Sequence, residues 1–292
     1  MSPELQKLKN FCDQAEKLTL TAKNEQSITE KRTAELVTKT DIDVSQLATQ
    51  FFNTNNLLDE EHLQKHPIPV EQRQAFLQKP ELWVVDDIDG TAAHASRQSA
   101  NPLAGLNFWG TTAGLWNYGK PIVGINALPS YIGERPDGTF FKGLILLAEN
   151  DKCYIQMGEN APITEWKLPD TSNNHFITLA SQTHSRYVVD FEDKTRTDKR
   201  FFPIDTHSCI YQFSNVFLGK TAASVFTGKP WDAAGSLAIA QSLGLELRKI
   251  KTGELFQGFH IEPMKNTWEL EDLYILSRPQ NYAIIRSALK AI

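Results

Sequence analysis

The sequence predicts a protein of mixed α and β structure, in which short strands run into helices and one such junction carries several acids. Residues 82–85, Leu-Trp-Val-Val, form an apolar run typical of a buried strand. Directly after it come Asp86, Asp87 and Asp89, then Gly90 and an alanine-rich segment that indicates a helix start. Apolar residues at helical spacing near the N-terminus, and strand-like runs in the middle of the chain, complete the mixed pattern.

The N-terminal elements follow from these patterns. Residues 5–18 carry apolar side chains at helical spacing, and a second amphipathic helix follows the segment 36–41, Leu-Val-Thr-Lys-Thr-Asp. Asp41 and Asp43 lie at or just before the start of that helix. Either acid could simply cap it, and for Asp43 we prefer this simple role. Residues 57–61, Leu-Leu-Asp-Glu-Glu, repeat the strand-to-acid pattern in miniature, although alone they fit a charged loop.

The later elements alternate between strands and helices. We expect a surface excursion with some helix at 62–80, two strands within 111–129 joined across 118–120, a hairpin of 140–148 with 153–157, a polar boundary at 167–175, a strand at 176–181, a helix at 209–218, a strand at 274–277 and a final helix at 282–292. Residues 230–235, Pro-Trp-Asp-Ala-Ala-Gly, open another helix, with Asp232 in its first turn. Taken alone, that carboxylate is a helix cap.

Composition places the chain among globular proteins and excludes some partners. Its 292 residues allow one large domain or two intimate ones, and 41% of them are hydrophobic and 22% charged. A net charge of −5 offers no basic footprint for nucleic acid. No apolar run is long enough to cross a membrane, and the polar N-terminus does not resemble a signal peptide. The three scattered cysteines fit reduced thiols and a cytoplasmic location.

The acids after residue 85 repel one another unless a positive charge lies between them. A divalent metal such as Mg²⁺ is the usual partner, because hard cations prefer carboxylate and carbonyl oxygens. A calcium loop with Gly90 at its sixth position fails, since its first and last positions would be Val85 and Ser96 instead of acids. A solvated turn of Asp and Gly residues stays open as an alternative at this point.

The acidic stretch is one of several short motifs in a fixed order. Residues 86–91 read Asp-Asp-Ile-Asp-Gly-Thr and residues 231–235 read Trp-Asp-Ala-Ala-Gly. Upstream, residues 37–41 read Val-Thr-Lys-Thr-Asp and residues 59–61 read Asp-Glu-Glu. In this order, they resemble the Val-Thr-x-x-Asp, Gly-Glu-Glu, Asp-Pro-Ile-Asp-Gly-Thr and Trp-Asp-x-Ala-Ala/Gly segments of the inositol monophosphatase-like family of magnesium-dependent, lithium-sensitive phosphatases. The resemblance spans nearly the whole chain.

The resemblance implies a site with two or more Mg²⁺ ions. Glu60, Asp86 and the carbonyl of Ile88 would hold the first ion, and Asp86, Asp89 and Asp232 the second. Two metals about 4 Å apart can activate a water molecule and stabilise the leaving alkoxide of a phosphate monoester.

The resemblance also implies the groups that handle water and phosphate. Asp41, Glu60 and Thr91 would position the attacking water, as is usual for positioned side chains in acid–base catalysis. The backbone amides of Gly90, Thr91 and Ala92 would grip the phosphate oxygens.

Departures from the family pattern bear on the substrate. Asp87 replaces a proline and could recruit another cation or face solvent, and we favour solvent; Asp59 replaces a glycine. Where many inositol phosphatases carry a glutamate that binds substrate hydroxyls, this chain has Val225. Residues 181–184, Ser-Gln-Thr-His, loosely resemble a Ser-x-Ser-His segment of 3′(2′),5′-bisphosphate nucleotidases, which would bring His184 to the substrate, but a strand-end turn fits them equally well.

From the resemblance we expect an α+β fold, a layered α-β-α-β-α sandwich of two closely packed halves like that of the sugar phosphatases. Residues 1–170 would carry most metal ligands, and residues 171–292 would carry Asp232 and part of the substrate pocket. The expected activity is Mg²⁺-dependent hydrolysis of inositol or sugar phosphates in the cytoplasm, with no nucleic acid or membrane partner; a homodimer stays open. The alternatives are a bisphosphate nucleotidase and a catalytically silent relative that binds or regulates.

Overall fold

A seven-stranded sheet carries the N-terminal part of the protein, in the order β3-β4-β5-β6-β7-β8-β9. The computed structural model describes residues 1–21, 29–30, 36–96, 108–135, 137–170, 176–179, 202–206, 208–259, 268–270 and 272–289. The strands are β3 (Leu57–Asp59), β4 (Leu82–Asp89), β5 (Gly110–Asn117), β6 (Lys120–Glu134), β7 (Phe140–Glu149), β8 (Lys152–Met157) and β9 (Thr164–Trp166). Only β3 and β4 run parallel in this sheet; the other neighbours are antiparallel.

A five-stranded sheet follows in the C-terminal part, in the order β11-β10-β12-β14-β13. Its strands are β10 (Phe176–Leu179), β11 (Phe202–Asp205), β12 (Ala223–Phe226), β13 (Glu246–Lys249) and β14 (Tyr274–Ser277). The short pair β1 (Thr29–Glu30) and β2 (Leu36–Val37) stands apart from both sheets. The chain changes sheet between β9 and β10, where the sequence predicts a boundary; the independence of the two halves stays a prediction.

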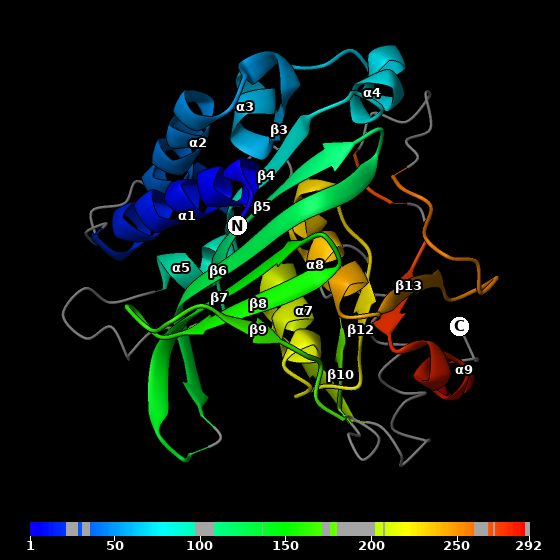
Figure 1. The fold of residues 1–292 in the computed structure, drawn as a ribbon. Helices are drawn as coiled ribbons and strands as arrows, with labels where there is room; N and C mark the ends of the chain where they lie inside the picture. The colour runs from blue at the N-terminus through cyan, green and yellow to red at the C-terminus, as the bar shows by residue number, and fades with distance from the viewer. Residues whose placement is uncertain are drawn as a thin grey trace.

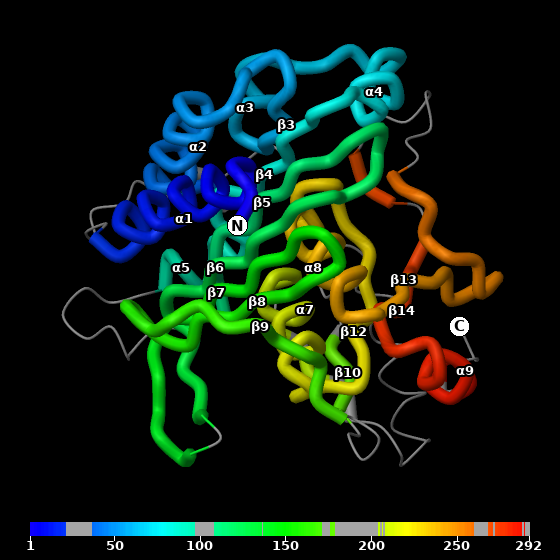
Figure 2. Tube along the Cα trace, viewed as in Figure 1, coloured from blue at the N-terminus to red at the C-terminus, as the bar shows by residue number. Residues whose placement is uncertain are grey.

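Helices cover and separate the two sheets (Figures 1 and 2). The helices are α1 (Pro3–Thr21), α2 (Lys39–Phe51), α3 (Glu60–Lys65), α4 (Val70–Leu77), α5 (Thr91–Ala95), α7 (Cys209–Phe217), α8 (Ser236–Ser242) and α9 (Pro279–Ala288), with short 3₁₀ turns η1 (Thr54–Asn56) and η2 (Trp231–Ala233). Helices α1 and α2 pack on the outer face of the large sheet, and α7 and α8 fill the space between the sheets. Helix α9 covers the far face of the small sheet. The expected α-β-α-β-α order is confirmed.

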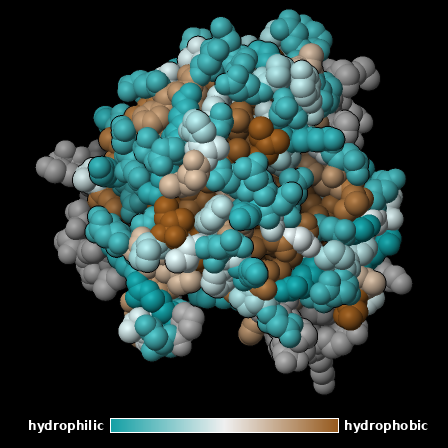
Figure 3. Space-filling view, in the orientation of Figure 1, coloured by the Kyte–Doolittle hydropathy of each residue, from teal (hydrophilic) through white to brown (hydrophobic). Residues whose placement is uncertain are grey.

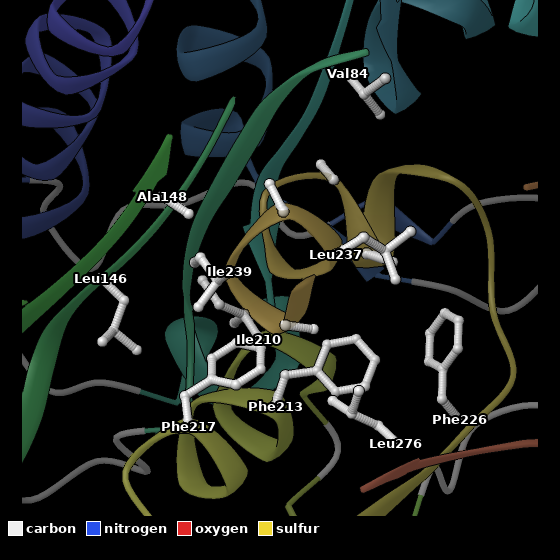
Figure 4. Close-up of a cluster of buried hydrophobic side chains, with 14 of the residues drawn as sticks. Val84, Leu146, Ala148, Ile210, Phe213, Phe217, Phe226, Leu237, Ile239 and Leu276 are labelled. Atoms are coloured by element: carbon white, nitrogen blue, oxygen red, sulfur yellow. The ribbon is translucent and has the colours of Figure 1, made fainter. Parts of the chain in front are cut away.

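The core between the sheets is aromatic and aliphatic. Figure 4 shows side chains of α7 and α8, among them Phe213, Phe217 and Ile239, packed toward Leu146 of the large sheet and Leu276 of the small one. The face drawn in Figure 3 is largely hydrophilic, with apolar side chains in separate small patches. Among the helices that the structure describes, none is long and apolar enough to cross a membrane.

The turn that precedes α8 lies directly on the large sheet. A Cβ atom at Gly235 would collide with the carbonyl oxygens of Ala113 and Ile125, so only glycine allows this backbone approach. A buried hydrogen-bond network fastens the same segment: Gly235 N donates to Thr112 Oγ1 at 3.0 Å, and Asn126 Nδ2 donates to Ser236 Oγ at 2.9 Å. The packing therefore fixes the residues just before α8 against the strands.

Several element boundaries differ from the sequence expectations. Strand β4 extends through Asp89, beyond the four apolar residues; it pairs with β3 on one side and β5 on the other and is buried along its whole length. The last helix begins at Pro279, whose ring fixes a helical φ at the first helical position, and ends at Ala288. Asp232 lies in the 3₁₀ turn η2, outside α8, which begins at Ser236. Residues 187–199, a charged stretch for which the sequence predicts partly helical structure, lie outside the described residues.

Candidate active site

The end of β4 brings Asp86 and Asp89 to a sharp backbone turn. Both side chains are buried, with exposed fractions of 7% and 9%. Gly90 follows in the left-handed region, at a φ of 89°, and a Cβ atom there would collide with the carbonyl oxygen of Phe108. Glycine is therefore required, and helix α5 begins at the next residue, Thr91.

Asp41 and Thr91 meet at this turn, although they come from different helices. The Thr91 hydroxyl lies 3.1 Å from Asp41 Oδ1 and 3.0 Å from the carbonyl oxygen of Ile88, and can donate to either. Asp41 Oδ2 accepts a hydrogen bond from the backbone N–H of Thr38, the residue that caps α2, at 2.7 Å. Asp41 therefore has a structural role in a capping box and a contact in the site at the same time.

Asp43 does not cap α2, contrary to the preferred sequence interpretation. Thr38 is the N-cap, so Asp43 lies within the helix, where it forms an i,i+4 ion pair with Lys39 at 2.5 Å on the surface. The sequence interpretation considered only the two acids as caps and overlooked Thr38, the residue directly before the helix.

Glu60 is the first residue of α3, and two groups of the second half hold its carboxylate. Lys229 Nζ lies 3.1 Å from Glu60 Oε1, and Trp231 Nε1 donates to Glu60 Oε2 at 3.1 Å. The backbone N–H of Lys229 donates to Asp232 Oδ2 at 2.7 Å. One short segment, residues 229–232, thus contacts Glu60 and supplies Asp232.

Asp89 is held by the start of helix α7. Its Oδ2 accepts a hydrogen bond from the backbone N–H of Ile210, and the Cys209 N–H and the Ser208 hydroxyl also donate to its carboxylate. The two backbone N–H groups are among those that the first turn of a helix leaves without intrahelical partners, and Ser208 is the N-cap of that helix. The carboxylate is thereby oriented from the second half of the protein.

Burial raises the pKa of the three aspartates of this cluster, and like charges add to the effect at Asp86 and Asp232. Burial and then the charges of Asp89, Asp232 and Glu60 raise the pKa of Asp86 well above its ordinary value. Burial raises the pKa of Asp89 to about 7 and that of Asp232 to about 8, the latter despite the nearby Lys229. A divalent cation would relieve this repulsion, and carboxylate and carbonyl oxygens are the ligands that Mg²⁺ takes. Within the described ranges, no three acidic, histidine or cysteine side chains are already arranged as a metal cage.

Asp87 is buried, so the expectation that it faces solvent is wrong. Its exposed fraction is 2%, and that of Asp59 is zero. Because β3 and β4 run parallel in register, with Asp59 opposite Val85, the two carboxyl groups lie together and can hydrogen-bond each other only if one of them holds a proton. Burial first, and then the charge of Asp59, raises the pKa of Asp87 well above its ordinary value. The two departures from the family pattern thus form one buried pair.

We expect Asp87→Asn to stabilise the protein near neutral pH. An amide can donate to Asp59 without a proton from solvent, and it removes a buried group that must stay neutral. In the wild type the pKa of Asp87 is higher in the folded state than in the unfolded state, where it is about 4. The free energy of unfolding therefore falls as the pH rises from the unfolded-state pKa toward the folded-state pKa. The gain should reach about 1 kcal/mol near pH 8 and shrink near pH 5.

Chemical denaturation of Asp87→Asn at both pH values, in the presence of chelator, tests this expectation. Asp43→Asn is the matched control, because it removes an exposed acid and should change stability little. A variant less stable than the wild type near pH 8 would contradict the buried-pair interpretation.

Three further residues, Ala92, Val225 and His184, were predicted to bind phosphate or substrate. Ala92 follows Thr91 in the first turn of α5. Val225 is buried in β12, in the apolar cluster beneath α9, and its role as a wall of the substrate pocket stays a prediction. His184 and its neighbours at 181–184 lie outside the described residues.

Three groups of contacts were missing from the sequence expectations. They are Lys229 and Trp231 on Glu60, Ser208 to Ile210 on Asp89, and the Asp59–Asp87 pair. A signal existed for Lys229, because a lysine directly before Pro-Trp-Asp in an acidic site invites a counter-ion role. The other two contacts depend on how strands and helices far apart in the sequence pack together.

Known structures share this fold over nearly their whole length. The IMPase of Thermotoga maritima matches with a TM-score of 0.68 and 15% identity, over 99% of this chain and 97% of its own. An IMPase/NADP phosphatase solved with Mg²⁺ and phosphate matches with a TM-score of 0.61 and 21% identity, over 98% and 92%. A lithium-soaked inhibitory complex of staphylococcal inositol monophosphatase-1 matches with a TM-score of 0.61 and 22% identity, over 97% and 91%.

These likenesses define the fold as that of the inositol monophosphatases. Residues 5–283 match the model of the inositol monophosphatase family, and the chain belongs to that family. Membership supports a phosphatase. No curated protein matches the sequence.

Proposed function

We propose that the protein is a Mg²⁺-dependent phosphomonoesterase that hydrolyses small inositol or sugar phosphates with a water molecule. The observation that carries the proposal is the gathering of Glu60, Asp86, Asp89 and Asp232 near the turn at Gly90, where burial and then the charges of neighbouring acids raise the pKa values of Asp86 and Asp232. Buried carboxylates this close need cations, and a phosphate ester is an anion that binds where cations have neutralised them. The structural neighbour solved with Mg²⁺ and phosphate supports this choice of metal and ligand.

The residues present fit the expected metal ions in their chemistry. Glu60, Asp86 and the Ile88 carbonyl would hold one ion, and Asp86, Asp89 and Asp232 the other. Bound there, the ions would activate water and stabilise the leaving alkoxide.

The remaining groups would position water and phosphate. Asp41 can hold the proton of the Thr91 hydroxyl, which leaves the oxygen lone pairs of Thr91 free to orient a water molecule. Glu60 would assist in positioning that water. The amides of Gly90, Thr91 and Ala92 would bind the phosphate oxygens, because the first N–H groups of a helix have no intrahelical partner.

The choice of alcohol is proposed from Val225. A valine cannot accept hydrogen bonds from polyol hydroxyls, and a site without such acceptors discriminates weakly among them. We therefore expect measurable hydrolysis of several small monoesters, including inositol 1-phosphate, without a sharp preference among polyols. Phosphate release at fixed Mg²⁺, compared as kcat/KM across polyol phosphates and adenosine 3′,5′-bisphosphate, tests this expectation.

His184→Ala belongs in the same measurement. A large preference for the bisphosphate that disappears in His184→Ala would favour the nucleotidase activity over the proposed one. Strong selection of one inositol phosphate isomer would show that other residues bind the hydroxyls. Failure to release phosphate from any ester, with Mg²⁺ bound, would indicate a catalytically silent relative.

A further inference from the structure

Lys229 links two of the acids to which we assign metal ions. Its ammonium lies 3.1 Å from Glu60 Oε1, and its backbone N–H donates to Asp232 Oδ2 at 2.7 Å. These two acids come from opposite halves of the fold, Glu60 from the start of α3 and Asp232 from η2. The lysine is therefore a cation of the chain itself inside an acidic site.

The Glu60 carboxylate is engaged through both of its oxygens. Lys229 Nζ donates to Oε1, and Trp231 Nε1 donates to Oε2 at 3.1 Å. The ammonium also lies 5.6 Å from the centre of the Trp231 ring, in cation–π range. The side chains of Lys229 and Glu60 are only 19% and 23% exposed, so solvent screens their ion pair less than it screens a surface pair.

The ion pair has two opposed consequences. It neutralises Glu60 beside Asp86 and Asp232, which would otherwise repel it, and so it stabilises the folded chain. A cation that binds Glu60 must also displace the ammonium or tolerate a second positive charge beside it. We propose that Lys229 is a positioning residue that competes with the divalent cation for Glu60 and thereby weakens Mg²⁺ binding. This inference rests on the proposed function, since that function assigns the metal to Glu60.

Lys229→Met separates the two consequences, because they change in opposite directions. Without divalent cation the variant should melt about 2–4 °C lower, since Glu60 loses its partner among like charges. In the same variant the dissociation constant for Mg²⁺, measured by calorimetry without substrate, should fall roughly three- to tenfold. Damage to the site alone would lower both the melting temperature and the affinity for Mg²⁺.

Further variants isolate the charge. Lys229→Arg keeps the positive charge and should keep the affinity of the wild type. Lys229→Gln keeps a hydrogen-bond donor without the charge and should bind Mg²⁺ more tightly, even if the methionine variant cannot be purified. Lys249→Met is the matched control, because Lys249 is paired with Asp272 and Glu254, which are not among the site acids. It should leave Mg²⁺ affinity unchanged.

The outcomes distinguish this inference from the proposed function. If the wild type binds Mg²⁺ and releases phosphate, but Lys229→Met and Lys229→Gln bind Mg²⁺ no more tightly than it does, the competition is refuted and the phosphatase stands. If the wild type neither binds Mg²⁺ nor releases phosphate, the proposed function is refuted first. Tighter binding in both uncharged variants, together with unchanged binding in Lys229→Arg and Lys249→Met, supports the competition.

Discussion

Asp89→Asn and Asp232→Asn should each lower turnover by about a thousandfold or more while the protein stays folded. Each change replaces an anionic ligand by a neutral one of nearly the same shape. Metal ions stabilise the transition state of phosphate hydrolysis by several kcal/mol, and each 1.36 kcal/mol is a factor of about ten in rate.

The fold should survive these substitutions for a local reason. The carboxylate of Asp89 accepts hydrogen bonds from the start of α7, and that of Asp232 accepts one from the Lys229 N–H. An asparagine oxygen can accept the same bonds. Without cations the variants should even unfold at a higher temperature, because an amide is buried at lower cost than a carboxylate and does not repel the neighbouring acids; burial, and then Asp89 and Glu60, raise the pKa of Asp232 to about 8.

Measured kcat and melting curves in chelator together test this prediction. Asp43→Asn is a suitable control, since it removes an exposed acid that pairs with Lys39 away from the site. If either site variant has the same kcat as the wild type, the metal assignment is wrong. An unfolded variant would show that the carboxylates are needed for structure instead.

Removal of divalent cations should abolish phosphatase activity, and added Mg²⁺ should restore it. The reason is electrostatic: burial first, and then the charges of neighbouring acids that include Asp89 and Glu60, raise the pKa values of Asp86 and Asp232. Lithium should inhibit at about millimolar concentration, as the resemblance to the family implies, because it competes for hard oxygen ligands. Phosphate release in excess chelator, compared with chelator saturated with Mg²⁺, is the measurement. Undiminished activity in excess chelator would exclude the two-metal proposal.

Each motif predicted a local structure that carries an acid, and the structure brings several of these acids close enough to influence one another; their roles stay predictions. A strand that ends in acids and a glycine predicted the turn at Gly90 correctly, and Asp41 could be placed at the start of a helix. The burial of Asp87 could not be predicted, since it depends on the parallel register of β3 with β4. The contacts of Lys229 with Glu60 likewise require two halves whose packing a sequence does not display.

The helices and strands, like the site, were predicted well where local sequence determines them and poorly where long-range packing does. Apolar spacing predicted α7 and β14 almost residue for residue, because each element is set by its own side chains. The layered order came only through the family resemblance. Helix α8 starts later than expected because the backbone of Gly235 rests on the large sheet, a contact between segments far apart in the chain.

That contact at Gly235 also bears on how the site can evolve. Where two backbones touch, every side chain larger than hydrogen is excluded, so the frame that carries Asp232 offers no room for gradual adjustment. Under the proposed function, we therefore expect new substrate preferences to arise from changes outside this frame, since surface loops generally accept substitutions and insertions more readily. A rigid acidic centre with adaptable surroundings allows one hydrolytic chemistry to be retained while the alcohol that it releases changes.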